Sequence, residues 1–93
     1  MIDLLRVGGI TGWLKVARLA EAFNLPVVSH RIPEIHVHLV SAIPNGLTVE
    51  YRPFTAGLFD EVPRLDAGYL LVPSRPGLGL TLDRSAIARY QVA

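Results

Sequence analysis

The sequence predicts an α/β domain built on parallel strands. Short apolar stretches that are typical of buried strands alternate with stretches whose apolar residues recur at helical spacing, in the order strand, helix, strand, helix, strand. The strand-like stretches are apolar almost throughout, as in parallel strands that are covered on both faces. In such folds the chemistry collects at the carboxyl ends of the strands.

The first strand and helix are separated by a pair of glycines. Residues 2–7 are short and apolar and end at Gly8-Gly9, which favours a buried strand. Residues 10–24 carry apolar side chains at helical spacing, with Trp13 expected in the core and Thr11 expected as the N-cap. Asn24, followed by Pro26, predicts the end of this helix.

The same pattern then repeats. Residues 26–30 form a short run with β-branched residues at its centre, which predicts a second strand. Pro33 suits the first turn of a helix, where its missing N–H costs nothing, and we expect this helix to reach residue 43. The turn signal at 44–46 leads into a third predicted strand at 47–51.

The remaining third of the chain is less regular. We expect a loop from residue 52 to residue 65. Residues 69–73 and 78–82 are predicted to pair as a hairpin across the turn at 74–77. Asp83 is predicted to cap a last helix over residues 84–91.

Composition limits the class of protein. With 93 residues, the chain allows a single domain, 1–93. A hydrophobic content of 51% with 18% charged residues excludes intrinsic disorder, and a net charge of +1 gives no electrostatic case for nucleic acid or an anionic membrane. No apolar run approaches the roughly 18 residues that span a bilayer. The absence of cysteine excludes disulfide scaffolds and is compatible with the cytoplasm, where we expect the protein to act.

Three polar residues fall at the predicted strand ends: Asp3, His30 and Glu50. An aspartate beside a histidine fixes the tautomer of the imidazole, and histidine is the usual general acid or base near neutral pH. A neighbouring glutamate could bind substrate, hold a metal or donate a hydrogen bond. On spacing alone, a structural interpretation is favoured, with Asp3 as a turn residue, His30 as a cap before the helix and Glu50 as a solvated charge.

A second group of polar residues lies in the predicted helix at 33–43. His36 and His38 form an H-x-H pair, but on a helix they are turned about 200° apart, so we do not expect a zinc site. We expect Glu34 and His38 to share one face near the strand ends and His36 to pack elsewhere.

Several motifs, in order and with their intervals, resemble the C-terminal part of the enolase superfamily. They are D-L-L-R-V-G-G-I-T-G-W at 3–13, V-S-H at 28–30, P-E-I-H-V-H-L at 33–39, V-E at 49–50 and P-G-L-G-L at 76–80. The similarity is greatest to the mandelate racemase type, which includes many acid-sugar dehydratases. It implies a (β/α)₈ TIM barrel in which this chain supplies strands six to eight, followed by a hairpin and a helix.

The resemblance also implies roles for the strand-end residues. Asp3, His30 and Glu50 would be catalytic, at the ends of the sixth, seventh and eighth strands. His30, oriented by Asp3, would move a proton at the carbon beside a carboxylate or help a β-hydroxyl leave. Glu50 would hydrogen-bond a carboxylate oxygen of the intermediate, and we expect Ser29 and Glu50 to contact the substrate.

The chain departs from the family by what it lacks. A complete barrel takes about 250 residues. The resemblance implies Mg²⁺ in the intact enzyme, but its carboxylate ligands on strands three to five, a second-strand lysine and a capping domain have no counterpart here. Lys15 is the only lysine, and we expect it to lie in a helix away from the site. We therefore interpret the chain as a fragment that lacks an N-terminal part or assembles with other copies.

Two functions follow as expectations. The first is a Mg²⁺-dependent enzyme that abstracts the α-proton of a small hydroxy acid or acid sugar, with dehydration favoured over racemisation or epimerisation. The isolated chain is expected to be inactive. The alternative is a non-catalytic remnant or oligomerising fragment without a metal site. Neither function calls for nucleic acid or a membrane as a partner.

Overall fold

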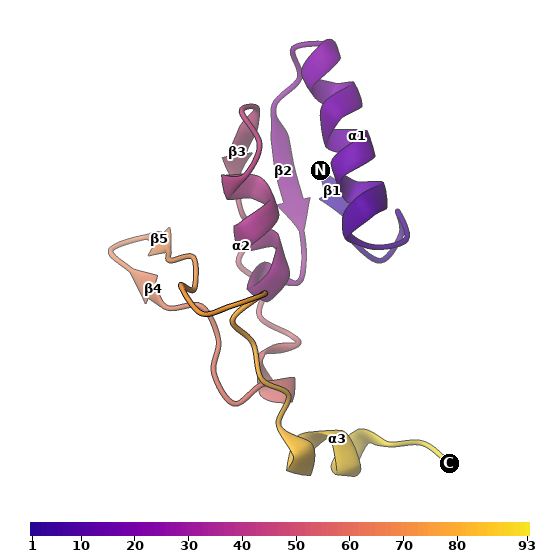
Figure 1. Ribbon diagram of the computed structural model, residues 1–93, viewed down its shortest axis with the longest axis vertical. Helices are drawn as coiled ribbons and strands as arrows, with labels where there is room; N and C mark the ends of the chain where they lie inside the picture. Colours follow the sequence, from indigo (N-terminus) through magenta and orange to yellow (C-terminus); the bar gives the residue numbers. More distant parts are fainter.

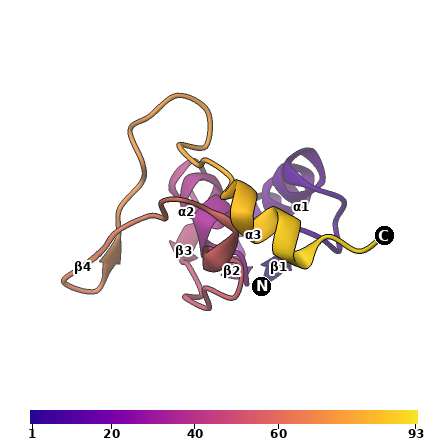
Figure 2. The same ribbon diagram turned by 90° about the horizontal axis from the view of Figure 1, so that it is seen from below.

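Three parallel strands with two helices on one side form the ordered body of the molecule. The computed structural model describes residues 1–93, and its first five elements are β1 (Ile2–Asp3), α1 (Ile10–Ala22), β2 (Val27–His30), α2 (Pro33–Ser41) and β3 (Gly46–Thr48) (Figure 1). The sheet order is β1-β2-β3, and both pairs are parallel. Seen from below, α1 and α2 lie on the same side of the sheet (Figure 2). The predicted α/β order of elements is confirmed.

The core lies between this sheet and its helices. Trp13 and Ala17 are the buried residues of α1, and both are fully shielded from solvent. They belong to one apolar cluster. Its other members lie in or next to β1, β2 and α2 and are Ile2, Leu4, Val27, Leu39, Val40 and Ile43. This packing fixes the strand ends relative to one another, because every strand–helix–strand unit contributes to it.

The first strand is shorter than predicted. The carboxylate oxygen Oδ1 of Asp3 accepts hydrogen bonds from the backbone N–H groups of Leu5 (2.9 Å) and Arg6 (3.1 Å), so the side chain stabilises a turn directly after Asp3. The cap of α1 is Gly9 rather than Thr11, since the Gly9 carbonyl accepts the N–H of Trp13. The predicted helix start at Pro33 is confirmed.

The predicted hairpin between residues 69–73 and 78–82 is wrong. β5 (Tyr69–Leu70) pairs instead with β4 (Leu65–Asp66), antiparallel, across Ala67 and Gly68, which both have positive φ, of 46° and 84°. A two-residue turn with both φ values positive suits a tight hairpin, and glycine adopts it at little cost. Prolines 73 and 76, which lack an N–H, disfavour the longer pairing.

The last segments extend away from the sheet. A short 3₁₀ turn, η1 (Ala56–Leu58), precedes an isolated antiparallel bridge between Phe59 and Leu82. The chain ends in α3 (Arg84–Tyr90), and the prediction that Asp83 caps it is confirmed, because its side chain accepts from the N–H groups of Ser85 and Ala86. None of the helices has the length and apolarity needed to cross a membrane.

Candidate active site

The ends of β1 and β2 bring an aspartate and a histidine into contact. Asp3 and His30 are register partners in the parallel pair, and Nδ1 of His30 lies 2.7 Å from Oδ2 of Asp3. Both side chains are partly accessible, at 14% for Asp3 and 25% for His30. The structure thus joins two of the three predicted catalytic residues into one hydrogen-bonded pair at the carboxyl edge of the sheet.

The environment of Asp3 favours its carboxylate form. The hydrogen bond from the backbone N–H of Arg6, and then that from His30, lower the pKa of Asp3 below its ordinary value of 3.8. An ionised carboxylate accepts a hydrogen bond from Nδ1–H of His30 and fixes that tautomer. Nε2 is then the nitrogen that can take up or release a proton.

Glu50 lies two residues beyond the end of β3 and is tied to the neighbours of His30. Its Oε2 accepts a hydrogen bond from the backbone N–H of Arg31 (2.7 Å), and its own N–H donates to Oγ of Ser29 (2.9 Å). Ser29 is fully buried, so its hydroxyl holds the backbone of Glu50 from the interior of the protein. The predicted trio therefore gathers at one edge of the sheet, with Glu50 connected to His30 through residues 29 and 31.

Arg31 contacts this group of residues in a way that the sequence did not reveal. It lies in the left-handed region, with φ of 59°, and this conformation presents its N–H to Glu50. Only Arg31 and Ile32 separate the last residue of β2 from Pro33, the first residue of α2. That very short connection was the one available signal that the backbone had to turn sharply at this point.

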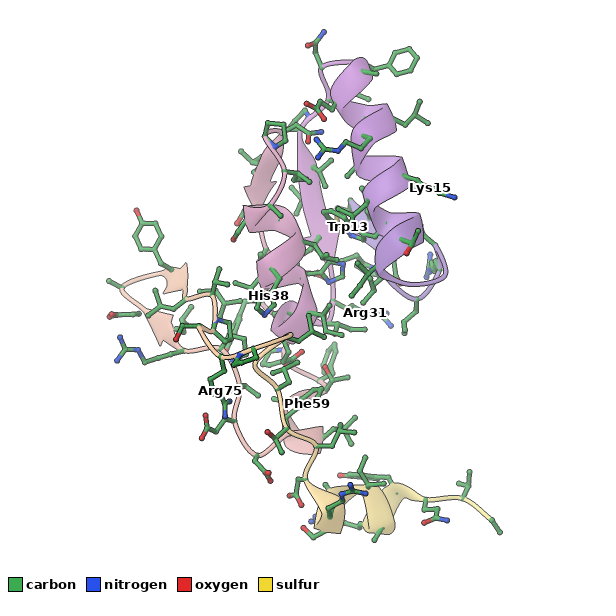
Figure 3. The ribbon with its side chains drawn as sticks, in the orientation of Figure 1. Trp13, Lys15, Arg31, His38, Phe59 and Arg75 are labelled. Atoms are coloured by element: carbon green, nitrogen blue, oxygen red, sulfur yellow. The ribbon has the colours of Figure 1, made fainter.

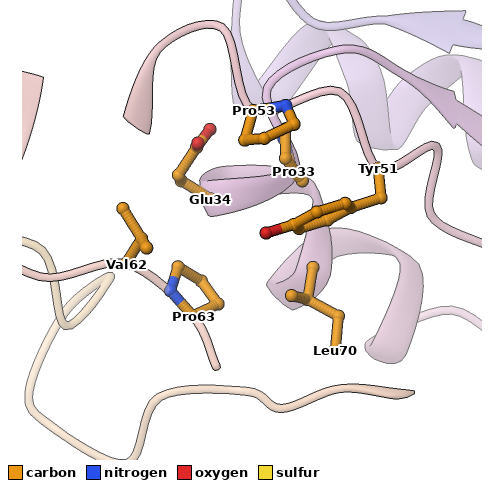
Figure 4. Close-up of a pocket in the computed structure, with 7 residues that line it drawn as sticks. All are labelled: Pro33, Glu34, Tyr51, Pro53, Val62, Pro63 and Leu70. Atoms are coloured by element: carbon orange, nitrogen blue, oxygen red, sulfur yellow. The ribbon is translucent and has the colours of Figure 1, made fainter. Parts of the chain in front are cut away.

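The polar residues of α2 lie apart from this pair. Glu34 is buried, and its Oε2 accepts a hydrogen bond from Oγ1 of Thr55 (2.8 Å). It lines a small pocket with Tyr51 and other residues of the loop that follows Glu50 (Figure 4). Nε2 of His38 lies 2.9 Å from the carbonyl oxygen of Leu78, whereas His36 packs in the core. The two histidines of α2 therefore lie in different surroundings, and neither forms a hydrogen bond with the Asp3–His30 pair.

Lys15 cannot reach the strand ends. Figure 3 shows its side chain on α1 pointing away from the sheet. The expectation that Lys15 lies in a helix away from the site agrees with this position.

Residues 1–86 match the model of a known family, described as enolase C-terminal domain-like. The chain belongs to this enolase family. Within it, the chain is of the mandelate racemase type, since it is similar to the solved structure of a mandelate racemase/muconate lactonizing enzyme from Polaromonas sp. JS666. The two are 46% identical with a TM-score of 0.87, over 95% of this chain and 24% of that one.

Relatives in the enolase family include acid-sugar dehydratases. The chain is 35% identical to D-xylonate dehydratase from Haloferax volcanii, over 97% of this chain and 24% of that protein. It is 46% identical to L-talarate dehydratase from Polaromonas sp. JS666, solved with Mg and L-glucarate, with a TM-score of 0.87 over 95% of this chain and 25% of that one. The chain thus spans about a quarter of the length of these relatives.

The structure of one relative above holds Mg, so the possible metal ligands of this chain are of interest. No three His, Asp or Glu side chains of the chain lie close enough together to hold a metal ion. Both oxygens of Asp3 already accept hydrogen bonds, from the turn and from His30, and Oε2 of Glu50 accepts one from Arg31. The donor set at the strand ends therefore fits proton transfer and does not fit a magnesium ion.

Proposed function

We propose that this chain supplies the proton-transfer part of the active site of an enolase-superfamily enzyme that removes the α-proton of a hydroxycarboxylate. The observation that carries the proposal is the 2.7 Å contact between His30 and Asp3 at the ends of adjacent parallel strands. The favoured reaction is dehydration of an acid sugar, because the relatives above include a D-xylonate and an L-talarate dehydratase.

In this mechanism His30 acts as both base and acid. Nε2 takes the proton from the carbon beside the carboxylate, while Asp3 holds the proton on Nδ1 and stabilises the imidazolium that forms. The electron pair left on the carbon expels the hydroxyl of the next carbon, which leaves as water when His30 returns the proton. General acid–base catalysis of this kind contributes about 10²–10⁴-fold to the rate.

Glu50 acts on the carboxylate of the substrate. Because Oε2 is occupied by the N–H of Arg31, we assign Oε1, in its protonated form, to a hydrogen bond with a carboxylate oxygen of the intermediate. Ser29 lies beneath the site, so it acts on the substrate through the Glu50 backbone that it holds. The catalytic set is then His30, Asp3 and Glu50, with Ser29 as a positioning residue.

The remaining parts of the site would come from outside these residues. We assign β1, β2 and β3 to the sixth, seventh and eighth strands of a (β/α)₈ barrel, a placement supported by three parallel strands in chain order with α1 and α2 on one side. A preceding N-terminal part, or other copies of the chain, would complete the barrel and hold Mg²⁺. A cytoplasmic enzyme acting on a small hydroxy acid fits this proposal.

Two other functions remain as alternatives. Racemisation or epimerisation uses the same proton abstraction without loss of the hydroxyl, so the geometry of His30 serves it equally. A non-catalytic remnant or oligomerising fragment is favoured by one observation, the absence of a metal-binding group of side chains in this chain. For the same reason we expect the isolated chain to be inactive.

A chimera tests the proposal. The quarter of the Polaromonas L-talarate dehydratase that matches this chain is replaced by residues 1–93, and dehydration of L-talarate is measured with Mg²⁺ present. We expect turnover by the chimera and a loss of about 10²–10⁴-fold in kcat with His30→Asn. His38→Asn removes an imidazole outside the site and serves as the control, with activity retained.

The outcomes separate the candidate functions. Full turnover with His30→Asn contradicts the assignment of His30 as acid and base. Conversion of L-talarate to an epimer, without loss of water, favours racemisation or epimerisation. A folded chimera that binds Mg²⁺ but turns over no substrate favours the non-catalytic alternative.

A further inference from the structure

The mechanism leaves one buried histidine unused. His36, in α2, is fully shielded from solvent, and its Nδ1 lies 2.6 Å from the carbonyl oxygen of Arg31 and 3.1 Å from that of Ile32. Because a carbonyl can only accept, Nδ1 carries the proton and donates to both. Its other nitrogen, Nε2, is buried without a hydrogen-bond partner. All the polar contacts of this side chain are therefore directed at the two residues that follow His30.

Those two residues hold a strained backbone. Arg31 and Ile32 both have positive φ, of 59° and 42°. Consecutive left-handed residues that are not glycine are uncommon, and a β-branched isoleucine is especially unfavourable there. Such a conformation persists only where surrounding contacts enforce it. The buried side chain of His36 donates hydrogen bonds to the carbonyl groups of both residues of this turn.

The turn has a consequence for the candidate site. In the left-handed conformation, the N–H of Arg31 donates to Oε2 of Glu50 at 2.7 Å. Relaxing the turn would redirect this N–H and release Glu50. The position of Glu50 relative to His30 therefore depends on a backbone conformation that the side chain of His36 stabilises.

The same histidine packs against the residue that supports the first strand. The rings of Trp13 and His36 lie 5.8 Å apart at an angle of 58°. Nε1 of Trp13 donates to the carbonyl of Ile2 (3.3 Å), the residue before Asp3. This buried pair thus contacts the backbone beside both members of the Asp3–His30 pair.

We propose that His36 is a positioning residue that holds the Arg31–Ile32 turn in its left-handed form and so fixes Glu50 beside His30. The inference rests on the proposed function for its effect on catalysis. Its structural part, the dependence of the Arg31 N–H on His36, stands independently of that function. It also assigns a role to the first histidine of the H-x-H motif, whose spacing alone indicated none.

Two amide substitutions form a matched pair for the test. In His36→Asn the side-chain NH₂ occupies about the place of Nδ1, whereas in His36→Gln it occupies about that of Nε2, away from the two carbonyls. In the 93-residue chain, hydrogen exchange of the Arg31 amide is followed by NMR in both variants. We expect this amide to exchange about tenfold faster in His36→Gln than in His36→Asn, since one hydrogen bond is lost. Amides in the middle of α1 report any general loosening.

The same variants are then measured in the chimera with L-talarate. We expect kcat to fall about tenfold further in His36→Gln than in His36→Asn, with KM similar in both. The reason is that Glu50, which would be displaced, acts on the intermediate and so in the transition state. Equal Arg31 exchange in the two variants, or equal loss of folding in both, overturns the proposal, because His36 then serves packing alone. If the chimera with the natural His36 is inactive while Arg31 exchange differs as expected, the proposed function fails and the role in the turn stands.

Discussion

At the scale of single residues, Asp3 makes two kinds of contact, one with a turn of the backbone and one with His30. One carboxylate oxygen orders the turn at Leu5 and Arg6, and the other binds His30. The turn shortens β1 to two residues and leaves Asp3 at the strand end. A structural interpretation of Asp3 as a turn residue and a catalytic one are therefore compatible, because the same side chain satisfies both.

Asp3→Asn is predicted to weaken the dependence of stability on acid pH. Since folding lowers the pKa of Asp3 below 3.8, its ionised form stabilises the fold above that value, and this stability is lost as pH falls through the folded pKa. The free energy of urea unfolding, measured by circular dichroism between about pH 2 and pH 6, should fall less steeply toward acid pH in the variant.

Asp66→Asn is the control for this measurement. Asp66 is exposed and forms only a surface ion pair with Arg64, at 3.5 Å. Its variant should keep the acid dependence of the natural chain. An Asp3→Asn variant with that same dependence would show that the carboxylate of Asp3 gains nothing on folding.

At the scale of secondary-structure elements, the sequence predicts the helices better than the strands. The helical spacing in 10–24 and Pro33 locate both ends of α1 and α2 to within two residues. The second strand lies within one residue of its predicted bounds, but the first ends early because of a side-chain contact, and the third ends at Thr48, before Glu50. The pairing of Phe59 with Leu82 depends on tertiary contacts that no local pattern reports.

The candidate site divides in the same way. The positions of Asp3, His30 and Glu50 at or just beyond the ends of neighbouring strands could be predicted from the sequence, whereas their catalytic roles were implied only by the resemblance to the family. The parts contributed by Arg31 and His36 could not, because one acts through its backbone N–H and the other through backbone carbonyls. These contacts depend on two left-handed residues, a conformation that the sequence around Ile32 does not favour.

Gly12→Ala is predicted to destabilise the fold although alanine favours helices. A Cβ at Gly12, in α1, would overlap the carbonyl oxygen of Val7, where the loop from β1 packs on the helix. The clash should outweigh the gain of about 1 kcal/mol in helix propensity, for a net loss of about 1–2 kcal/mol in the free energy of unfolding. Gly57→Ala, where a Cβ meets nothing within 4 Å, should be neutral in the same urea titration.

At the scale of the whole molecule, the chain is less compact than its length allows. Its accessible surface is 6336 Å², against about 5,300 Å² for a compact monomer of this mass. Its radius of gyration is 14.0 Å, where about 12 Å is usual for this length. Both outer strands of the sheet have an unpaired edge, and β3 is exposed throughout. Large apolar side chains, among them Leu47, Phe54 and Leu65, are exposed on this surface.

The isolated chain is predicted to self-associate. Unpaired strand edges and exposed apolar side chains favour association. Sedimentation equilibrium should show species heavier than 10.2 kDa that increase with concentration. Leu47→Lys, at the exposed β3 edge, should reduce this association, whereas Leu65→Lys, in the outer hairpin, should leave it unchanged. A single 10.2 kDa species at every concentration would refute the expectation.

The measurement that tests the central claim most directly is exchange of the α-proton of the substrate with solvent. The chimera is incubated with L-talarate in D₂O and Mg²⁺, and the α-proton signal of the remaining substrate and the deuterium in the product are followed by NMR. If His30 is the acid and base held by Asp3, proton abstraction occurs in the chimera and is lost with His30→Asn, while His38→Asn retains it. Abstraction that continues unchanged in the His30→Asn chimera would contradict the account.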